Sequence, residues 1–155
     1  MHLRTATESD VPILAALFRE TVLVNAPQHY TPAQTEAWAT VDSLRFRQFI
    51  LGVTTYVAED DTGILGFAGV GDDGYVASAY VRHDCLHRGI GSILMQAVLA
   101  HAQEKQMHRL YSEASEFSLG LFQKFGFSQY DTEVVNRNGV EFTRYLVERV
   151  WVETP

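Results

Sequence analysis

The sequence predicts a mixed α/β fold, an α+β domain of about seven strands with helices packed against the sheet. Three observations predict it. Strand-like and helix-like segments follow one another along the whole chain, a glycine pair separates a buried strand from a long helix, and turn residues join neighbouring strands into hairpins. Composition agrees, because 46% of the residues are hydrophobic and 20% are charged, which is typical of a globular protein. A chain of 155 residues is expected to form a single domain, residues 1–155.

The N-terminal third is predicted to be one short strand followed by helices. Thr31 and Gln34 fit a capping box around Pro32, which stands at the first helical position, where proline is tolerated. The predicted elements are a strand at residues 2–6, a helix from residue 11, a second helix from residue 31 to about 38, and a helical piece at residues 43–51.

The remaining two thirds are predicted to be strands with two further helices. Residues 60–63 form the turn of one hairpin, and Asn138 with Gly139 is the favoured pair for the tight turn of another. The predicted strands are residues 54–59, 64–70, 75–81, 109–113, 127–135 and 140–152, and the predicted helices are residues 92–105 and 116–125.

Residues 87–92 join the central strand to the long helix and include Gly89 and Gly91. The first amides of a helix have no partner inside the helix, so this junction can expose several N–H donors. The helix dipole attracts anions, and glycine lacks the Cβ that would block close approach or a positive φ. An ordinary turn is the alternative, but a glycine pair that follows a strand and opens a helix favours a phosphate-binding loop.

Charge and cysteine usage exclude several classes of protein. The formal net charge of −7 argues against binding to a nucleic acid backbone, which needs clustered lysine and arginine. The lone Cys85 excludes an internal disulfide and a multi-cysteine metal site, and it fits a reducing cytoplasm. The histidines show no metal-ligand spacing, no apolar run reaches transmembrane length, and the first residues do not resemble a signal peptide. We therefore expect a cytoplasmic protein without a metal, membrane or nucleic-acid partner.

Two segments resemble motifs of the GNAT (GCN5-related) N-acetyltransferase family. Residues 79–81, followed by HRGIGSIL at residues 87–94, are similar to the family's acetyl-CoA pyrophosphate loop, usually written Q/R-x-x-G-x-G/A. The sequence LFQKFGF at residues 121–127 is similar to the family's F-Y-x-K-x-G-F segment. Residues 28–32 and 37–39 further resemble the YafP-like branch of bacterial GNAT proteins. The resemblance covers nearly the whole chain.

This resemblance implies a GNAT fold with a central, twisted, mostly antiparallel sheet. It implies transfer of an acetyl group from acetyl-CoA to the amine of a small molecule or a protein, by direct attack of that amine on a thioester held between two diverging strands. A monomer and a homodimer are both compatible with it. The residues that it places at acetyl-CoA are Ala79, Tyr80, Val81, His87, Arg88, Gly89, Ile90, Gly91, Ser92, Ser115, Phe122 and Lys124. His29 and Tyr30 are expected to line the acceptor pocket, although His29 could equally be an exposed loop residue.

The chain departs from the family pattern at two positions. Leu86 stands where the loop motif has Gln or Arg, but an amide cradle depends on glycine geometry rather than on that side chain. Phe122 stands where many members have a tyrosine that is thought to protonate the departing thiolate. General-acid help is typically worth ~10²–10⁴-fold, but a thiol of pKa about 8.5 leaves fairly well, so we expect activity to survive. The alternative is a protein that binds acyl-CoA as a sensor or scaffold without turnover.

The acceptor amine must lose a proton, because an alkyl amine of pKa about 10.4 is almost fully protonated at neutral pH. Glu113 is the candidate base, since it closes the strand that precedes the helix expected to pack on the cofactor. It could instead cap that helix through Ser115 and Glu116. A water, or another donor such as Tyr80 or Tyr111, is expected to supply the proton in place of the missing tyrosine.

Overall fold

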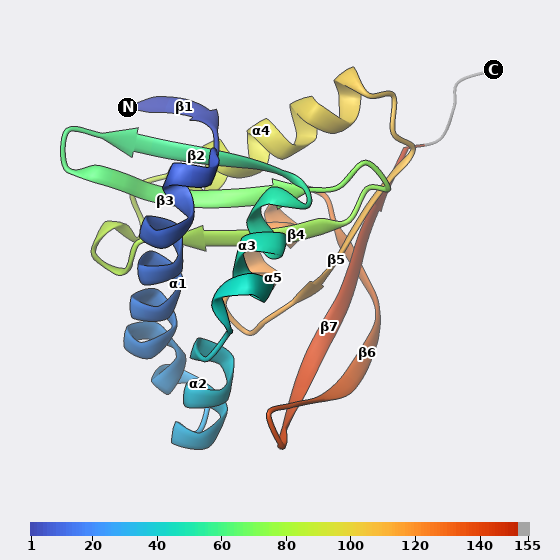
Figure 1. Ribbon diagram of the computed structural model, residues 1–155. Helices are drawn as coiled ribbons and strands as arrows, with labels where there is room; N and C mark the ends of the chain where they lie inside the picture. Colours follow the sequence, from blue (N-terminus) through green and yellow to red (C-terminus); the bar gives the residue numbers. More distant parts are fainter. Residues whose placement is uncertain (152–155) are drawn as a thin grey trace.

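The computed structural model describes residues 1–151 of the chain. In that part of the chain, strands and helices follow the predicted order (Figure 1). The strands are β1 (His2–Thr5), β2 (Thr54–Asp60), β3 (Gly63–Val70), β4 (Val76–Val81), β5 (Arg109–Ala114), β6 (Ser128–Arg137) and β7 (Val140–Val150). The α-helices are α1 (Val11–Asn25), α2 (Pro32–Ala39), α3 (Ser43–Leu51), α4 (Ile90–Glu104) and α5 (Leu119–Lys124).

The strands form two sheets that meet at β4 and β5. The first sheet has the order β1-β2-β3-β4 and the second has the order β5-β7-β6, and the pairings within each sheet are antiparallel. Between the sheets, the structure records one parallel bridge among the described residues, Tyr75 with Tyr111, beside a 3.0 Å hydrogen bond from the Tyr111 amide to the Gly74 carbonyl. Past this bridge β5 turns away from β4 (Figure 1). The prediction of a mostly antiparallel sheet whose central strands diverge is confirmed.

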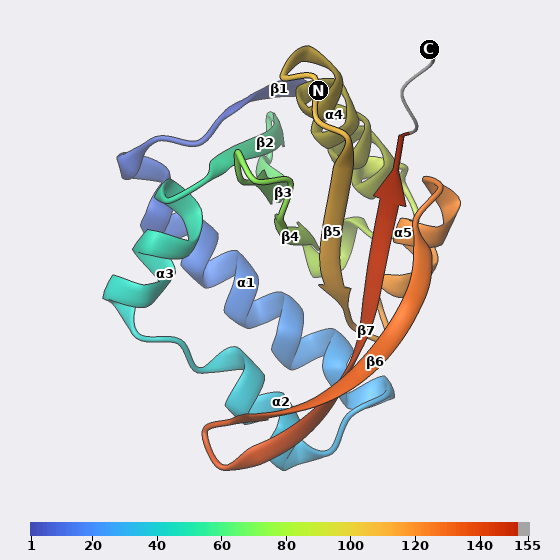
Figure 2. The ribbon, with the colours of Figure 1, turned by 90° about the vertical axis from the view of Figure 1, so that its right-hand side faces the viewer.

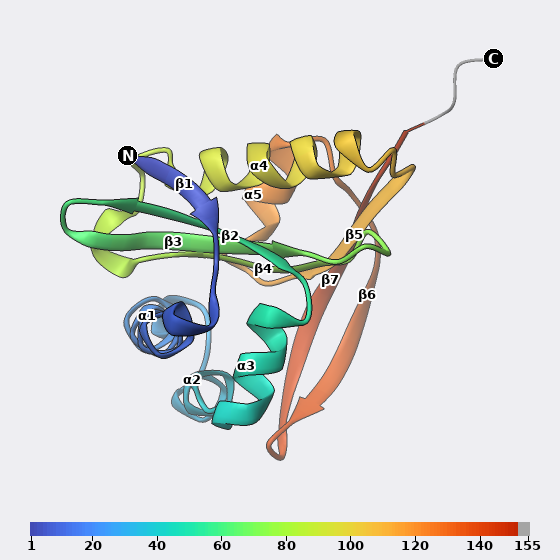
Figure 3. The same cartoon turned by 45° about the horizontal axis from the view of Figure 1, so that its top comes forward.

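Helices cover both faces of the first sheet, as Figure 3 shows, with α4 on one face and α1, α2 and α3 on the other. Each face has its own hydrophobic core. The α4 core includes Leu94, Val98 and Leu110, and the opposite core includes Leu14 and Phe67, all at most 1% exposed. The first sheet is therefore buried on both faces, and alternate side chains of each strand pack into one core or the other.

The β6–β7 hairpin bends across to reach α2, far from it in sequence (Figure 2). The Gln34 side-chain amide donates to the Glu141 carbonyl at 3.0 Å, and the Asn138 amide at the tip of the hairpin donates to the Ala37 carbonyl at 3.1 Å. Asn138 itself has a φ of 51° and Gly139 a φ of 79°, as the predicted tight turn requires. These bonds hold the β6–β7 hairpin against α2.

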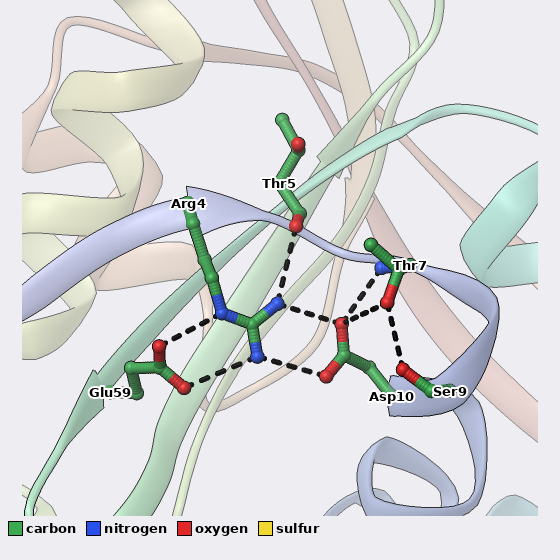
Figure 4. A network of polar contacts seen from close by, with 6 residues as sticks. All are labelled: Arg4, Thr5, Thr7, Ser9, Asp10 and Glu59. Atoms are coloured by element: carbon green, nitrogen blue, oxygen red, sulfur yellow. Dashed lines mark hydrogen bonds and ion pairs between the residues drawn. The ribbon is translucent and has the colours of Figure 1, made fainter.

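A charged network fixes the N-terminal strand to the start of α1 (Figure 4). The Arg4 guanidinium donates to both Asp10 oxygens, at 2.8 and 2.9 Å, and to both Glu59 oxygens, at 2.9 and 3.2 Å. Asp10 also accepts from the Thr7 amide at 2.7 Å. The Arg4 hydrogen bond and ion pair lower the pKa of the Asp10 carboxyl to about 2. This network joins β1, β2 and the entry to α1.

Two predicted helix starts differ from the structure. Helix α4 begins at Ile90, inside the glycine pair, so Gly91 lies in its first turn. Helix α5 begins at Leu119, because the hydroxyls of Ser115 and Ser118 hold the preceding residues in a turn. The capping box of α2 is confirmed, since Thr31 and Gln34 each bond the other's backbone amide. The predicted end of the last strand at residue 152 lies outside the described residues.

No helix within residues 1–151 is long and apolar enough to cross a membrane. Over the same residues, no group of three or more His, Cys, Asp or Glu side chains is arranged to hold a metal ion.

Candidate active site

The candidate site lies where β4 and β5 separate. Gly69 of β3 pairs with Ser78, but the next residue, Val70, pairs with Val76. The residue between Ser78 and Val76 therefore has no partner on β3 and forms a bulge in β4. After the bulge, the Tyr80 side chain packs in the core on the α1 side, while Ala79 and Val81 pack against the core on the α4 side. Side chains of β4 therefore alternate between the two cores at the point where no described strand pairs with its outer edge.

The glycine loop has the geometry of an anion site. Gly89 has a φ of 81°, in the left-handed region, and a Cβ built there would meet nothing within 4 Å. The first hydrogen bond of α4 runs from the Ile93 amide to the Gly89 carbonyl at 3.1 Å. The amides of residues 90–92 therefore precede the helical ladder and have no partner within it. Three aligned donors at the positive end of a 15-residue helix fit a pyrophosphate.

The other loop residues divide into side chains that face solvent and side chains that pack. His87 and Arg88 are exposed, and His87 also has a positive φ of 63°. Ile90 is buried at 3% exposure and anchors the loop in the core. Gly91 has a packing role, because an added Cβ would meet the Leu121 side chain at 3.4 Å. The loop is thus packed against the core at Ile90 and Gly91 and exposed to solvent at His87 and Arg88.

Ser92 and Lys124, predicted separately from the two motifs, are in contact. The Lys124 ammonium donates to the Ser92 hydroxyl at 2.9 Å, although the two residues lie 32 positions apart. This bond joins the start of α4 to the end of α5 and places a cation beside the unpaired amides. The structure therefore brings the two motifs together at one corner of the molecule.

Ser115 and Phe122 are both engaged within the protein. The Ser115 hydroxyl accepts from the amides of Phe117 and Ser118, at 3.2 and 3.1 Å. The Phe122 ring is 3% exposed and meets the Phe127 ring edge-on, with 5.0 Å between centroids. Their contact with acetyl-CoA stays a prediction, and Phe122 is first of all a core residue.

An aromatic cluster covers the opposite side of the two strands. The Tyr30 ring lies 5.3 Å from Trp38 and 6.1 Å from both Phe117 and Phe142, centroid to centroid. The Tyr30 hydroxyl accepts from the Glu116 amide at 3.0 Å, and burial raises the pKa of this phenol. The cluster therefore joins the segment before α2 to the turn that follows β5.

His29 is exposed, with its ring edge-on to Phe117 at 4.9 Å. Both rings lie at the rim of the cluster, since Phe117 is 36% exposed. The position of His29 fits an acceptor-facing residue and also fits the exposed loop residue that the sequence allowed.

Tyr80 has the hydrogen-bonding pattern of a proton donor. The Trp38 indole N–H donates to the Tyr80 hydroxyl at 3.2 Å, which leaves the phenolic hydrogen free to donate elsewhere. Burial raises the pKa of Tyr80, so the phenol keeps its proton at neutral pH. Tyr111 differs, because its hydroxyl already donates to Asp73 at 2.9 Å. Of the two candidate donors, Tyr80 is the one left available.

The hydroxyls of Ser115 and Ser118, and not the Glu113 carboxylate, bond the backbone amides of the turn before α5. The Glu113 carboxylate instead lies 3.7 Å from the Arg144 guanidinium of β7 and carries 24% side-chain exposure. Burial and the nearby Glu113 carboxylate raise the pKa of Tyr75. Glu113 thus lies beside the diverging strands, partly exposed, with one cation near it.

Sequence reasoning missed Trp38, Tyr75, Phe117 and Arg144 as parts of this site. Trp38 lies in the segment that resembles the YafP-like branch, and the pattern of the chain gave no signal for Tyr75 and Phe117 beyond their aromatic character. A register for the last hairpin could have found Arg144, because it fixes which β7 residues share a face with Glu113.

Comparisons with known proteins agree with this geometry. The model of the acetyltransferase (GNAT) domain matches residues 26–149. The chain is 26% identical to the N-acetyltransferase YafP of Escherichia coli, over 95% of this chain and 94% of that protein. It is 30% identical to an L-methionine sulfoximine/L-methionine sulfone acetyltransferase of Pseudomonas aeruginosa, over 81% of this chain and 78% of that one.

Among solved structures, a GCN5-related N-acetyltransferase from Rhodopseudomonas palustris superposes with a TM-score of 0.92. It is 24% identical, and the match covers 97% of this chain and 95% of that one. The predicted fold and family resemblance are therefore confirmed: the chain belongs to the GNAT family and is an acetyl-CoA-dependent N-acetyltransferase.

Proposed function

We propose that this enzyme acetylates the amine of a small molecule, in one domain spanning residues 1–155, with the pyrophosphate of acetyl-CoA on the amides of residues 87–92 and Glu113 as the base. The interrupted ladder between β4 and β5 carries the proposal, because the glycine loop follows one strand and Glu113 lies near the end of the other. A thioester held between these strands has the loop on one side and the base on the other.

Each proposed role follows from what the chain's own residues offer. No described strand pairs with the outer edge of β4 at Ala79, Tyr80 and Val81, although the Val81 carbonyl accepts from the Thr21 hydroxyl at 3.3 Å. Ser92 and Lys124 add polar groups beside the amide cradle, and Arg88 is proposed to add a cation. Acetyl-CoA supplies the acetyl group as a thioester. Glu113 accepts the proton that the amine loses as its nitrogen bonds the carbonyl carbon, and Tyr80 donates a proton to the sulfur as the carbon–sulfur bond breaks.

The closed side of the molecule supports a small acceptor rather than a protein. Two hydrogen bonds hold the β6–β7 hairpin against α2, and the rings of Tyr30 and Phe142 meet beneath them, 6.1 Å apart. We infer that these contacts would hinder a protein segment approaching from the side of α2 more than a small amine. His29 and Tyr30, at the rim, are proposed to contact the acceptor.

A thiol-release assay with a panel of amines tests the proposal. The panel holds L-methionine sulfone and L-methionine sulfoximine, after the relative named above, together with spermidine and a peptide with an N-terminal alanine. We expect CoA release with at least one small amine, no release with the peptide, and a kcat lowered ~10²–10⁴-fold in Glu113→Gln. Release with the peptide alone would contradict the small-acceptor proposal.

A further inference from the structure

The tip of the β6–β7 hairpin holds Arg137 beside the end of α2. The Asn138 side-chain amide donates to the Ala37 carbonyl at 3.1 Å and to the Thr40 carbonyl at 3.4 Å. Figure 2 shows the tip of the hairpin next to α2. Because Arg137 directly precedes Asn138 in the chain, these two bonds also fix the backbone of Arg137 at this place.

The strand register places the Arg137 side chain on the face of the hairpin that carries Phe142. Arg137 pairs with Val140 and Val135 pairs with Phe142, and residues two apart on a strand point to the same face. The Phe142 ring lies 6.1 Å from the Tyr30 ring, centroid to centroid. Arg137 therefore lies on the face that meets the aromatic cluster.

The Arg137 guanidinium is close enough to Tyr80 to act on its phenol. Burial raises the pKa of Tyr80, and the positive charge of Arg137 opposes that rise. The Tyr80 hydroxyl also accepts from the Trp38 indole N–H at 3.2 Å. The tip of the hairpin, α2 and β4 thus meet around the hydroxyl that we propose as the proton donor.

Arg137 has no protein partner that neutralises its charge. Within residues 1–151, the structure records neither a hydrogen bond nor an ion pair for this exposed side chain. Two nearby acceptors are already bonded elsewhere, since the Ala39 carbonyl accepts from Arg19 at 3.3 Å and Glu133 accepts from Arg144. A guanidinium is a planar donor that matches the geometry of a carboxylate. An unpaired guanidinium beside aromatic rings therefore fits a ligand with an apolar body and an acidic end.

We propose that Arg137 binds a carboxylate of the acceptor, and that the acceptor is an amino acid whose amine and carboxylate are separated by a chain of several carbon atoms. The inference rests on the proposed small-molecule acceptor and on Glu113 as its base. The separation follows from the register, because Arg137 pairs with Val140 and Glu113 pairs with Leu146, six positions further along β7. At about 3.4 Å per residue these positions are roughly 20 Å apart. The two side chains shorten that span, but the neighbouring amine and carboxylate of an α-amino acid do not bridge it.

Matched acid and amide acceptors test the proposal. 6-Aminohexanoate and 6-aminohexanamide have the same amine and the same length and differ in the anionic group, and kcat/KM for CoA release is measured with each. We expect the wild type to prefer the acid by at least about fivefold, and Arg137→Gln to show no preference. Arg137→Lys should keep part of the preference, because it keeps the charge. Arg45→Gln is the matched control and should keep all of it, since Arg45 of α3 is also exposed and its side chain has no hydrogen bond among the described residues.

An acid preference that Arg137→Gln removes supports the proposal. A wild type without the preference, or an Arg137→Gln variant that retains it, would overturn it. β-Alanine and β-alaninamide are too short to span the site and should react alike, and an equally large preference for this shorter acid would contradict the proposed separation.

Binding without turnover separates this inference from failure of the proposed function. The NMR signal of the Arg137 Nε–H group, identified by its loss in Arg137→Gln, should shift when 6-acetamidohexanoate is added and stay in place when 6-acetamidohexanamide is added. Equal shifts with both compounds, or none with either, would refute the contact. Full activity of Glu113→Gln would instead remove Glu113 as the base and leave this NMR result unchanged.

Discussion

Replacing Gly89 with alanine tests the amide cradle, and Gly139→Ala is its matched control. The two glycines have φ values of 81° and 79°, and an added Cβ meets nothing within 4 Å at either position. Both substitutions therefore carry the same cost of a left-handed L-residue, about 1 kcal/mol, without a steric clash. Any difference in acetyl-CoA affinity between the variants must therefore come from the phosphates that we expect to bind at residue 89.

The two variants should lose similar stability but differ in acetyl-CoA affinity. A methyl group at residue 89 would stand where the phosphates approach the amides, and loss of one charge-assisted hydrogen bond is worth about 1.5–3 kcal/mol. That range corresponds to an affinity lower by roughly ten- to over a hundredfold in Gly89→Ala. Urea unfolding measures the stability and isothermal titration calorimetry measures the affinity. Equal affinities in Gly89→Ala, Gly139→Ala and the wild type would refute the reasoning.

Three further predictions concern other parts of the molecule. Because Arg4 lowers the Asp10 pKa from 3.8 to about 2, its stabilisation is complete above the unfolded pKa and lost as pH falls towards 2. The unfolding free energy of Asp10→Asn should thus be about 2 kcal/mol below wild type at pH 7, with the gap closing between about pH 4 and 2 in urea titrations; a constant gap would contradict this. Tyr80→Phe should lower kcat by at least about tenfold at unchanged acetyl-CoA affinity, and an unchanged kcat would remove Tyr80 as the donor. Phe122→Tyr should change kcat less than about tenfold, since the ring is 3% exposed, whereas a ~10²-fold rise would show that the missing tyrosine limits the enzyme.

The order of elements and the glycine loop could be predicted from the sequence because they depend on local signals. The left-handed Gly89, the turn at Asn138 and the capping box at Thr31 follow from residue types at fixed spacing. The start of α5 could not be predicted, because it depends on which of two neighbouring serines bonds which amide.

The partners of Glu113 could not be predicted either, because they come from strands far apart in the chain. Arg144 reaches it only through the β5–β7 register, and Trp38 reaches Tyr80 across 42 positions of sequence. Residence in the cytoplasm and the absence of a nucleic-acid partner stay predictions from composition. The cofactor loop can thus be predicted from local sequence, whereas the rest of the site depends on contacts between distant segments.

A crystal structure with acetyl-CoA bound tests the central claim most directly. We predict that the pyrophosphate oxygens lie within hydrogen-bond distance of amides of residues 87–92, with the pantetheine along the edge of β4 and the acetyl group facing Glu113. A pyrophosphate bound elsewhere, or an acetyl group on the side of the strands away from Glu113, would contradict it.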